Sequence, residues 1–87
     1  MTRYGAVMQL DVFPDQMHLR REDPSRNLRR FYMLCVQRDL LGGAVLVREW
    51  GRIGSPGQVR VDHHQDEGHA INALADLVAS KRKRGYS

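Results

Sequence analysis

Residues 30–37 of the chain, RFYMLCVQ, decide its fold class. Aromatic and β-branched residues favour a pleated strand, in which alternate side chains point to opposite faces. Two apolar sets therefore alternate, with Tyr32, Leu34 and Val36 on one face and Phe31, Met33 and Cys35 on the other. Because both faces are apolar, the stretch is expected to be a central strand that is covered on both sides.

Further strands are predicted on either side of this stretch. Residues 44–50 are rich in valine and form a second strong strand, which a Gly-Gly turn joins to the first. Residues 58–63 alternate between valines and polar side chains, which predicts a strand with one polar face. Upstream, residues 17–21 alternate weakly and are interpreted as a strand, and residues 22–27 are interpreted as a turn.

The hydrophobic period changes after the last of these strands. Apolar residues now recur at helical spacing and form one stripe, made by Ala70, Ile71, Leu74, Leu77 and Val78. Asp66 stands at the N-cap position and Gly85 is a natural stop, so a helix is predicted over residues 67–83. Strands followed by one helix indicate an α+β fold, with a twisted antiparallel β-sheet packed against one C-terminal α-helix.

A chain of 87 residues suffices for one small domain around a single core. Residues 17–87 are assigned to this domain, and residues 1–16 to an N-terminal extension or an added edge strand. Little room is left for a catalytic cleft, and no nucleophile–base set or paired-carboxylate site stands out. We therefore expect a binding module rather than an enzyme, with no cofactor and no small-molecule substrate.

The composition is that of an ordinary globular domain, with 41% hydrophobic and 28% charged residues. No apolar run approaches the roughly 20 residues that span a bilayer, and the first ten residues lack the features of an export signal. The one cysteine, Cys35, cannot form an internal disulfide and is interpreted as an inert core residue. A cytoplasmic location without membrane contact is expected.

The positive charge is unevenly distributed along the chain. The formal net charge is +4, and nine of the 14 basic residues fall into two clusters. The clusters consist of Arg20, Arg21, Arg26, Arg29 and Arg30, and of Lys81, Arg82, Lys83 and Arg84. Such clusters suit a polyanionic partner. Solvated arginines beside turns, together with a helix end whose dipole favours cations, explain them equally well.

A group of acidic and histidine side chains surrounds the predicted start of the helix. Its members are Asp62, His63, His64, Asp66 and His69. The last two histidines are five residues apart rather than at the i, i+4 spacing of a metal-binding helix, and no cysteine is near. No metal site is therefore predicted.

Residues 48–58, REWGRIGSPGQ, contain Trp50-Gly51-Arg52 and resemble the signature of the WGR domain. Upstream, residues 30–37 resemble the first long strand of that family, and downstream, residues 81–86, KRKRGY, resemble its close. The similarity runs from about residue 17 to residue 86 and is greatest to the short stand-alone bacterial members.

The resemblance implies a twisted antiparallel sheet wrapped against one helix, in agreement with the periodicity. In the DNA-repair poly(ADP-ribose) polymerases, the WGR domain binds near a DNA break. There the motif tryptophan packs against the sugar at the strand end, and the motif arginine helps to join domains. By resemblance, Trp50 is the stacking residue, Arg52 a docking or phosphate residue, and Gly51 permits close backbone approach. No other domain of those enzymes is recognisable in the sequence, so no ADP-ribosyl transfer is expected.

Each motif residue also has a purely structural interpretation. Trp50 is either a stacking platform or a half-buried packing residue at a strand end. Arg52 contacts either a phosphate or a strand-end carbonyl or carboxylate. Arg48, with Arg60, either extends a basic surface or pairs across strands with Glu49 or Asp62.

Two functions remain open. The first is nucleic-acid binding at DNA ends or nicks, through Trp50, Gly51, Arg52, Arg48, Arg29, Arg30, Lys81, Arg82, Lys83 and Arg84. The second is protein–protein interaction or self-association through the same motif surface. The surroundings of Trp50 discriminate between them, because a continuous basic face favours nucleic acid and an apolar patch favours protein.

Overall fold

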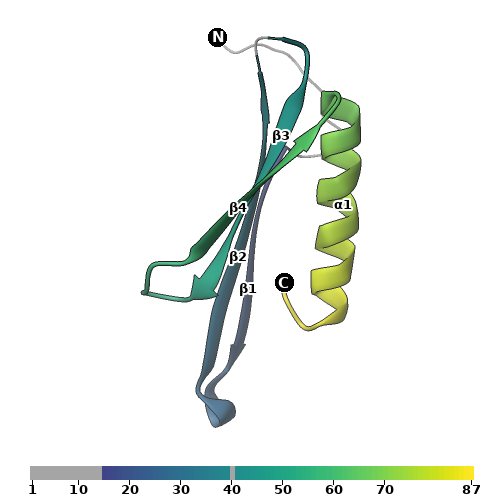
Figure 1. The fold of residues 1–87 in the computed structure, drawn as a ribbon. Helices are drawn as coiled ribbons and strands as arrows, with labels where there is room; N and C mark the ends of the chain where they lie inside the picture. Colours follow the sequence, from purple (N-terminus) through teal and green to yellow (C-terminus); the bar gives the residue numbers. More distant parts are fainter. Residues whose placement is uncertain (1–14, 40) are drawn as a thin grey trace, which may run out of the picture.

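The computed structural model describes residues 15–39 and 41–87. Four strands form one antiparallel sheet in the order β1-β2-β3-β4, and one helix follows (Figure 1). The elements are β1 (Gln16–Asp23), β2 (Leu28–Arg38), β3 (Ala44–Arg52), β4 (Gln58–His64) and α1 (Glu67–Lys83), with a 3-10 turn (Pro24–Arg26) between β1 and β2. The predicted α+β fold is confirmed. Within the residues described, no helix has the length and apolar character needed to cross a membrane.

The helix begins and ends where the sequence predicts. The Asp66 side chain accepts a hydrogen bond of 2.8 Å from the backbone N–H of His69, which satisfies one of the free donors of the first turn. Gly85 has a φ of +96°, a left-handed conformation that ends the helix, and the Tyr86 N–H then donates to the Lys81 carbonyl. The tail thus turns back toward the sheet.

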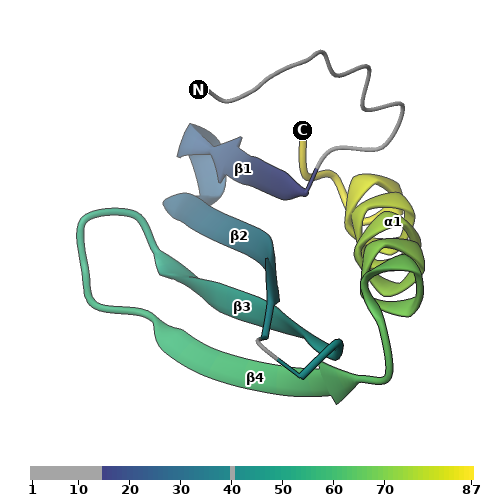
Figure 2. The ribbon, with the colours of Figure 1, turned by 90° about the horizontal axis from the view of Figure 1, so that it is seen from above.

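The hydrophobic core lies between α1 and one face of the sheet, here called the helix-side face (Figure 2). Its members come from β1, β2, β3 and α1, and they are Leu19, Tyr32, Leu34, Val36, Ala44, Leu46, Ala70, Leu74 and Val78. This settles which of the two apolar sets of β2 meets the helix. It is the set of Tyr32, Leu34 and Val36, because Tyr32 is directly opposite the buried Leu19 and Val36 is directly opposite the buried Leu46.

The other face of the sheet, here called the open face, is not covered by any described element. Phe31, Met33 and Cys35 are therefore only partly buried, and the prediction that both faces are covered is wrong for the described residues. In β4 the polar alternation points to the helix side, since Asp62 is opposite the buried Leu46. Val59 and Val61 consequently lie on the open face, where they are 60% and 48% exposed.

The two edges of the sheet differ. Along β1, the backbone of Ser87 accepts a bond of 2.9 Å from Arg20 and donates one of 2.8 Å back to it. Strand β4 forms the opposite edge. The expectation for residues 1–16 lies outside the described residues except at Asp15 and Gln16, where β1 begins opposite Cys35.

Candidate functional site

Three aromatic rings gather on the helix-side face, beside the C-terminal end of α1. Tyr32 and Trp50 are cross-strand neighbours, and their rings stack with centroids 5.7 Å apart and planes inclined by 17°. Tyr86 meets Tyr32 edge-on, with centroids 6.2 Å apart. Trp50 is half-buried and packs against the core, so it fulfils its structural role and still presents part of its indole to solvent.

Two cations lie over these rings. The Lys81 Nζ is 4.4 Å from the centroid of Tyr32 and 5.7 Å from that of Tyr86. The Arg48 Cζ is 5.9 Å from the centroid of Trp50. Cations at such distances are attracted by the ring quadrupole. The rings therefore hold positive charge beside the exposed part of the tryptophan.

Arg48 is partly neutralised by a neighbour. Its Nε lies 2.9 Å from the Asp62 Oδ2, an ion pair without a well-aligned hydrogen bond, and its Nη1 donates to the Tyr32 hydroxyl at 3.3 Å. The other Asp62 oxygen is 3.0 Å from the Arg60 Nε. The cross-strand alternative for Arg48 is thus present in the structure, and each Asp62 oxygen lies near one arginine.

A row of three arginines adjoins the aromatic rings. Arg21, Arg30 and Arg52 are directly opposite one another on β1, β2 and β3. They lie on the same face as Trp50, two residues farther along each strand. Among the residues described, no carboxylate lies within 4.0 Å of their guanidinium groups. The row therefore keeps its positive charge.

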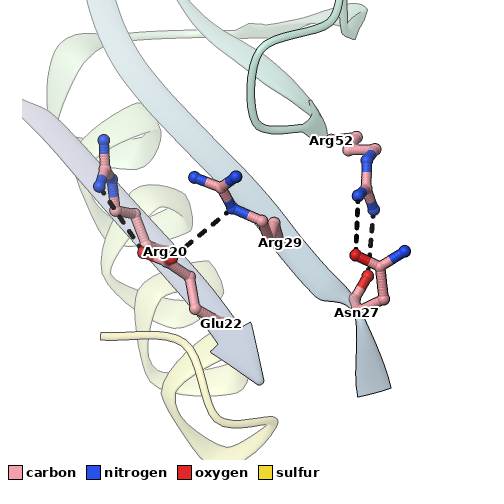
Figure 3. A network of polar contacts seen from close by, with 5 residues as sticks. All are labelled: Arg20, Glu22, Asn27, Arg29 and Arg52. Carbon is pink, nitrogen blue, oxygen red and sulfur yellow. Dashed lines mark hydrogen bonds and ion pairs between the residues drawn. The ribbon is translucent and has the colours of Figure 1, made fainter. Parts of the chain in front are cut away.

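Arg52 is held in place by uncharged oxygens rather than by an acid. It donates to the Asn27 backbone carbonyl at 3.1 Å and to the Asn27 Oδ1 at 3.2 Å (Figure 3). Asn27 can present both because it adopts a left-handed conformation, with a φ of 52°, after the 3-10 turn. The arginine is thereby ordered without losing its charge.

The helix end adds further cations to this region. Burial lowers the pKa of Lys81, and the positive charges of Arg84, Arg48 and Arg30 lower it further. Each of these arginines is thus close enough to Lys81 to repel its positive charge. Held-together like charges favour the arrival of an anion.

The structure separates the remaining predicted residues from this surface. Arg29 lies on the open face, where it is 3.8 Å from a Glu22 oxygen, and Glu22 is also 3.7 Å from Arg20 (Figure 3). Arg82 lines a groove between α1 and β1, and Lys83 is exposed in the last turn. Arg21 was not predicted as a site residue. Arg21 lies two residues after the buried Leu19, so strand alternation places both on the helix-side face. There Arg21 is directly opposite Arg30.

Gly51 and Gly57 shape the loop after the motif. A Cβ on Gly51 would lie 3.0 Å from the Gly57 Cα and 3.5 Å from the Phe31 ring. A Cβ on Gly57 would lie only 2.6 Å from the Trp50 carbonyl oxygen. The close backbone approach expected at Gly51 is therefore made by the chain's own loop, which fixes the end of β3.

The acidic and histidine group near the helix start is engaged in local contacts. The Asp66 Oδ1 is 2.8 Å from the His69 Nδ1, and the backbone N–H of His69 is the main cause of the lowered pKa of Asp66. In the part of the chain that the structure describes, no three His, Cys, Asp or Glu side chains converge on a point that could hold a metal ion.

Comparison with known proteins identifies the family. The WGR domain family matches residues 15–87. An uncharacterised protein of Sinorhizobium fredii, y4dW, is 44% identical over 73 residues, which cover 84% of this chain and 36% of that protein. The chain thus spans about a third of the length of this curated relative. No solved structure matches. WGR domains are a nucleic-acid-binding type of module, and over residues 15–87 this chain belongs to the WGR domain family.

Proposed function

We propose that the chain is a non-catalytic nucleic-acid-binding module that prefers DNA ends or nicks. The observation that carries the proposal is the row Arg21, Arg30 and Arg52, which lies beside Trp50 without a carboxylate partner among the described residues. Arg48, Lys81 and Arg84 extend the same basic surface. We call these six cations and Trp50 the basic face.

The surroundings of Trp50 favour nucleic acid over a protein partner at this surface. Its ring is flanked by Arg48, and the next row of the sheet carries Arg30 and Arg52. The apolar side chains that would suit a protein interface lie on the open face instead. A basic rather than apolar border around an exposed aromatic ring supports phosphate and sugar contacts.

The spacing of the row suits a single nucleic-acid backbone. Neighbouring strands lie about 4.8 Å apart, so three arginines in register span about 10 Å. Successive phosphates of one strand advance about 3.4 Å along the helix axis but lie farther apart along the winding backbone, so the row reaches about two to three of them. Arginine also presents a planar fork that binds phosphate through two donors.

The half-burial of Trp50 supports a preference for ends. The Tyr32 ring already occupies one side of the indole, which leaves only a limited surface for a ligand. Inside a duplex both faces of each base are stacked, whereas a terminal base or sugar has a free surface. Contact with Trp50 is therefore available at an end or a nick without first breaking a stack.

Fluorescence anisotropy tests the proposal with a nicked hairpin, a blunt duplex and a single strand across a salt series. Arg30→Ala should weaken binding by about three- to tenfold at low salt and reduce the salt slope by about 1. Trp50→Ala should abolish the preference for ends. Arg29→Ala is the matched control, because it removes the same charge one residue away but from the open face.

Two outcomes would contradict the proposal. The first is absence of binding to all three probes at low salt. The second is an equal loss of affinity in Arg29→Ala and Arg30→Ala, which would mean that net charge rather than the basic face controls binding. Circular dichroism of each variant excludes loss of the fold as the cause.

A further inference from the structure

Strand β4 is a regular edge strand whose outer side no described residue occupies (Figure 2). All seven of its residues pair with β3 in continuous register, without a bulge, and the strand contains no lysine or proline. Bulges, prolines and charged side chains, above all lysine, are the usual devices that keep an edge strand from pairing with another chain. Strand β4 carries two charged side chains, Arg60 and Asp62, but they have opposite signs and can complement a second copy, so β4 stays competent to extend a sheet.

The side chains of β4 also favour a partner. Val59 and Val61 are 60% and 48% exposed on the open face, and Val61 continues an apolar row through Val47 to Cys35. Helix α1 approaches β4 only lightly, and Arg60 on the helix side remains exposed. Both faces of the strand edge are therefore accessible to a second chain.

We propose that two copies of the chain associate by antiparallel pairing of their β4 strands about a twofold axis at Val61. The two sheets then form one continuous eight-stranded sheet. In this register Val61 is opposite its own copy and Val59 is opposite His63. Arg60 of each copy is opposite Asp62 of the other, so two opposite-charge pairs form across the axis.

Charge selects this register over its neighbours. A twofold axis perpendicular to the sheet keeps each side chain on the same face in both copies. Directly opposite residues must then be an even number of positions apart in the sequence, so the axis lies beside a residue that faces its own copy. An axis at Arg60 would place two arginines opposite each other, and an axis at Asp62 would place two aspartates together. Only the axis at Val61 aligns all seven residues of both strands and opposes each acid with a base.

The expected dimer is weak and concentration-dependent. An edge of seven residues with two valines buries less than the area of about 1,200 Å² that marks stable interfaces. Trp50 and Arg48 of the basic face lie one strand in from this edge, opposite Gln58 and Arg60, and no residue of β4 belongs to the basic face. The dimer therefore does not depend on nucleic-acid binding.

Sedimentation velocity from low micromolar to near-millimolar concentration tests the association. We expect a monomer–dimer equilibrium that Val61→Lys abolishes, because it places two lysines opposite each other at the axis. His18→Lys, at an exposed position of the opposite edge strand β1, is the control and should leave the equilibrium unchanged. A monomer at every concentration, or a dimer that persists in Val61→Lys, overturns the proposal.

Cross-linking tests the register independently of the equilibrium. In a Cys35→Ser background, Val61→Cys places two thiols directly opposite each other, about 4.5 Å apart at Cβ, where mild oxidation joins them. Val59→Cys is the matched control, because its copy lies four residues along the strand, about 14 Å away. A covalent dimer in Val61→Cys alone is the expected result. Equal cross-linking of both variants, or of neither, contradicts the register.

Discussion

The two faces of the sheet carry similar side chains but meet different surroundings. Each face of β2 carries a row of bulky apolar residues. Near the start of the strand each row is preceded by an arginine, Arg30 on the helix-side face and Arg29 on the open face. Helix α1 covers the first face, and its basic end adds Lys81 and Arg84 there. On the open face the single carboxylate of Glu22 lies within 3.8 Å of both Arg29 and Arg20 and offsets part of their charge.

The difference teaches that the position of one helix gives each face its role. The helix buries the apolar part of the helix-side face. Its basic end adds Lys81 and Arg84, for which no carboxylate partner is present among the described residues. The open face keeps balanced charges and exposed valines. A basic surface and an apolar surface thus lie on opposite sides of a single layer of strands.

The largest expected contrast between the faces is in stability. Leu34, which is 2% exposed on the helix side, should lose about 2–5 kcal/mol on substitution with alanine, because a cavity remains. Met33, its neighbour on the open face, should lose about 1 kcal/mol. Urea unfolding of the two variants measures this. Equal losses would mean that the open face is also covered in solution.

The loop after β3 provides the second contrast. Gly57→Ala should cost about 1–3 kcal/mol, because the new Cβ meets the rigid Trp50 carbonyl. Gly51→Ala should cost less, because its tightest contact is at 3.0 Å and the loop can yield. Thermal unfolding ranks the two. The reverse order would show that the Phe31 ring, rather than the backbone, limits the packing.

Trp50 offers a spectroscopic way to assign a ligand to a face. It is the one tryptophan of the chain and lies on the helix side, stacked on Tyr32. DNA bound at the basic face should change its emission intensity, whereas a ligand on the open face should leave it unchanged. A titration followed by both emission and anisotropy makes the test. Saturable binding without any change in emission would place the ligand elsewhere.

The smallest expected effect concerns Asp66 at the start of α1. The hydrogen bond from the His69 N–H lowers the pKa of Asp66, so its contribution to stability is present above the ordinary aspartate range. That contribution is lost as the pH falls below about 4. Asp66→Asn keeps the cap but should flatten the fall of Tm between neutral and acid pH. Asp76→Asn, an exposed charge farther along α1, is the control and should not.

The sequence predicts the elements well because each carries its own local pattern. The apolar stripe from Ala70 to Val78, the Asp66 cap and the Gly85 stop bound α1 as observed. The alternation in β2 likewise predicts a strand. These patterns involve residues that are near in sequence, so they require no knowledge of the tertiary fold.

The same patterns leave the faces undecided. Both sets in β2 are apolar, so neither periodicity nor composition indicates which set meets α1. The pairing of Arg52 with Asn27 joins residues 25 positions apart and depends on a left-handed turn. Arg29 and Arg30 are the same residue type at consecutive positions of β2. They differ only in the face of the sheet on which each side chain lies. Long-range pairing therefore decides the candidate site.

The backbone bonds between Ser87 and Arg20 limit how many copies can join. They occupy the outer edge of β1 at Arg20, near the middle of the strand, so the β4 strand of another copy cannot pair along the full length of β1 without displacing the tail. Growth by repeated β1-to-β4 contacts would produce an open filament, whereas β4-to-β4 contact uses the same surface twice and closes. A short tail that holds one edge thus separates a finite assembly from fibre formation.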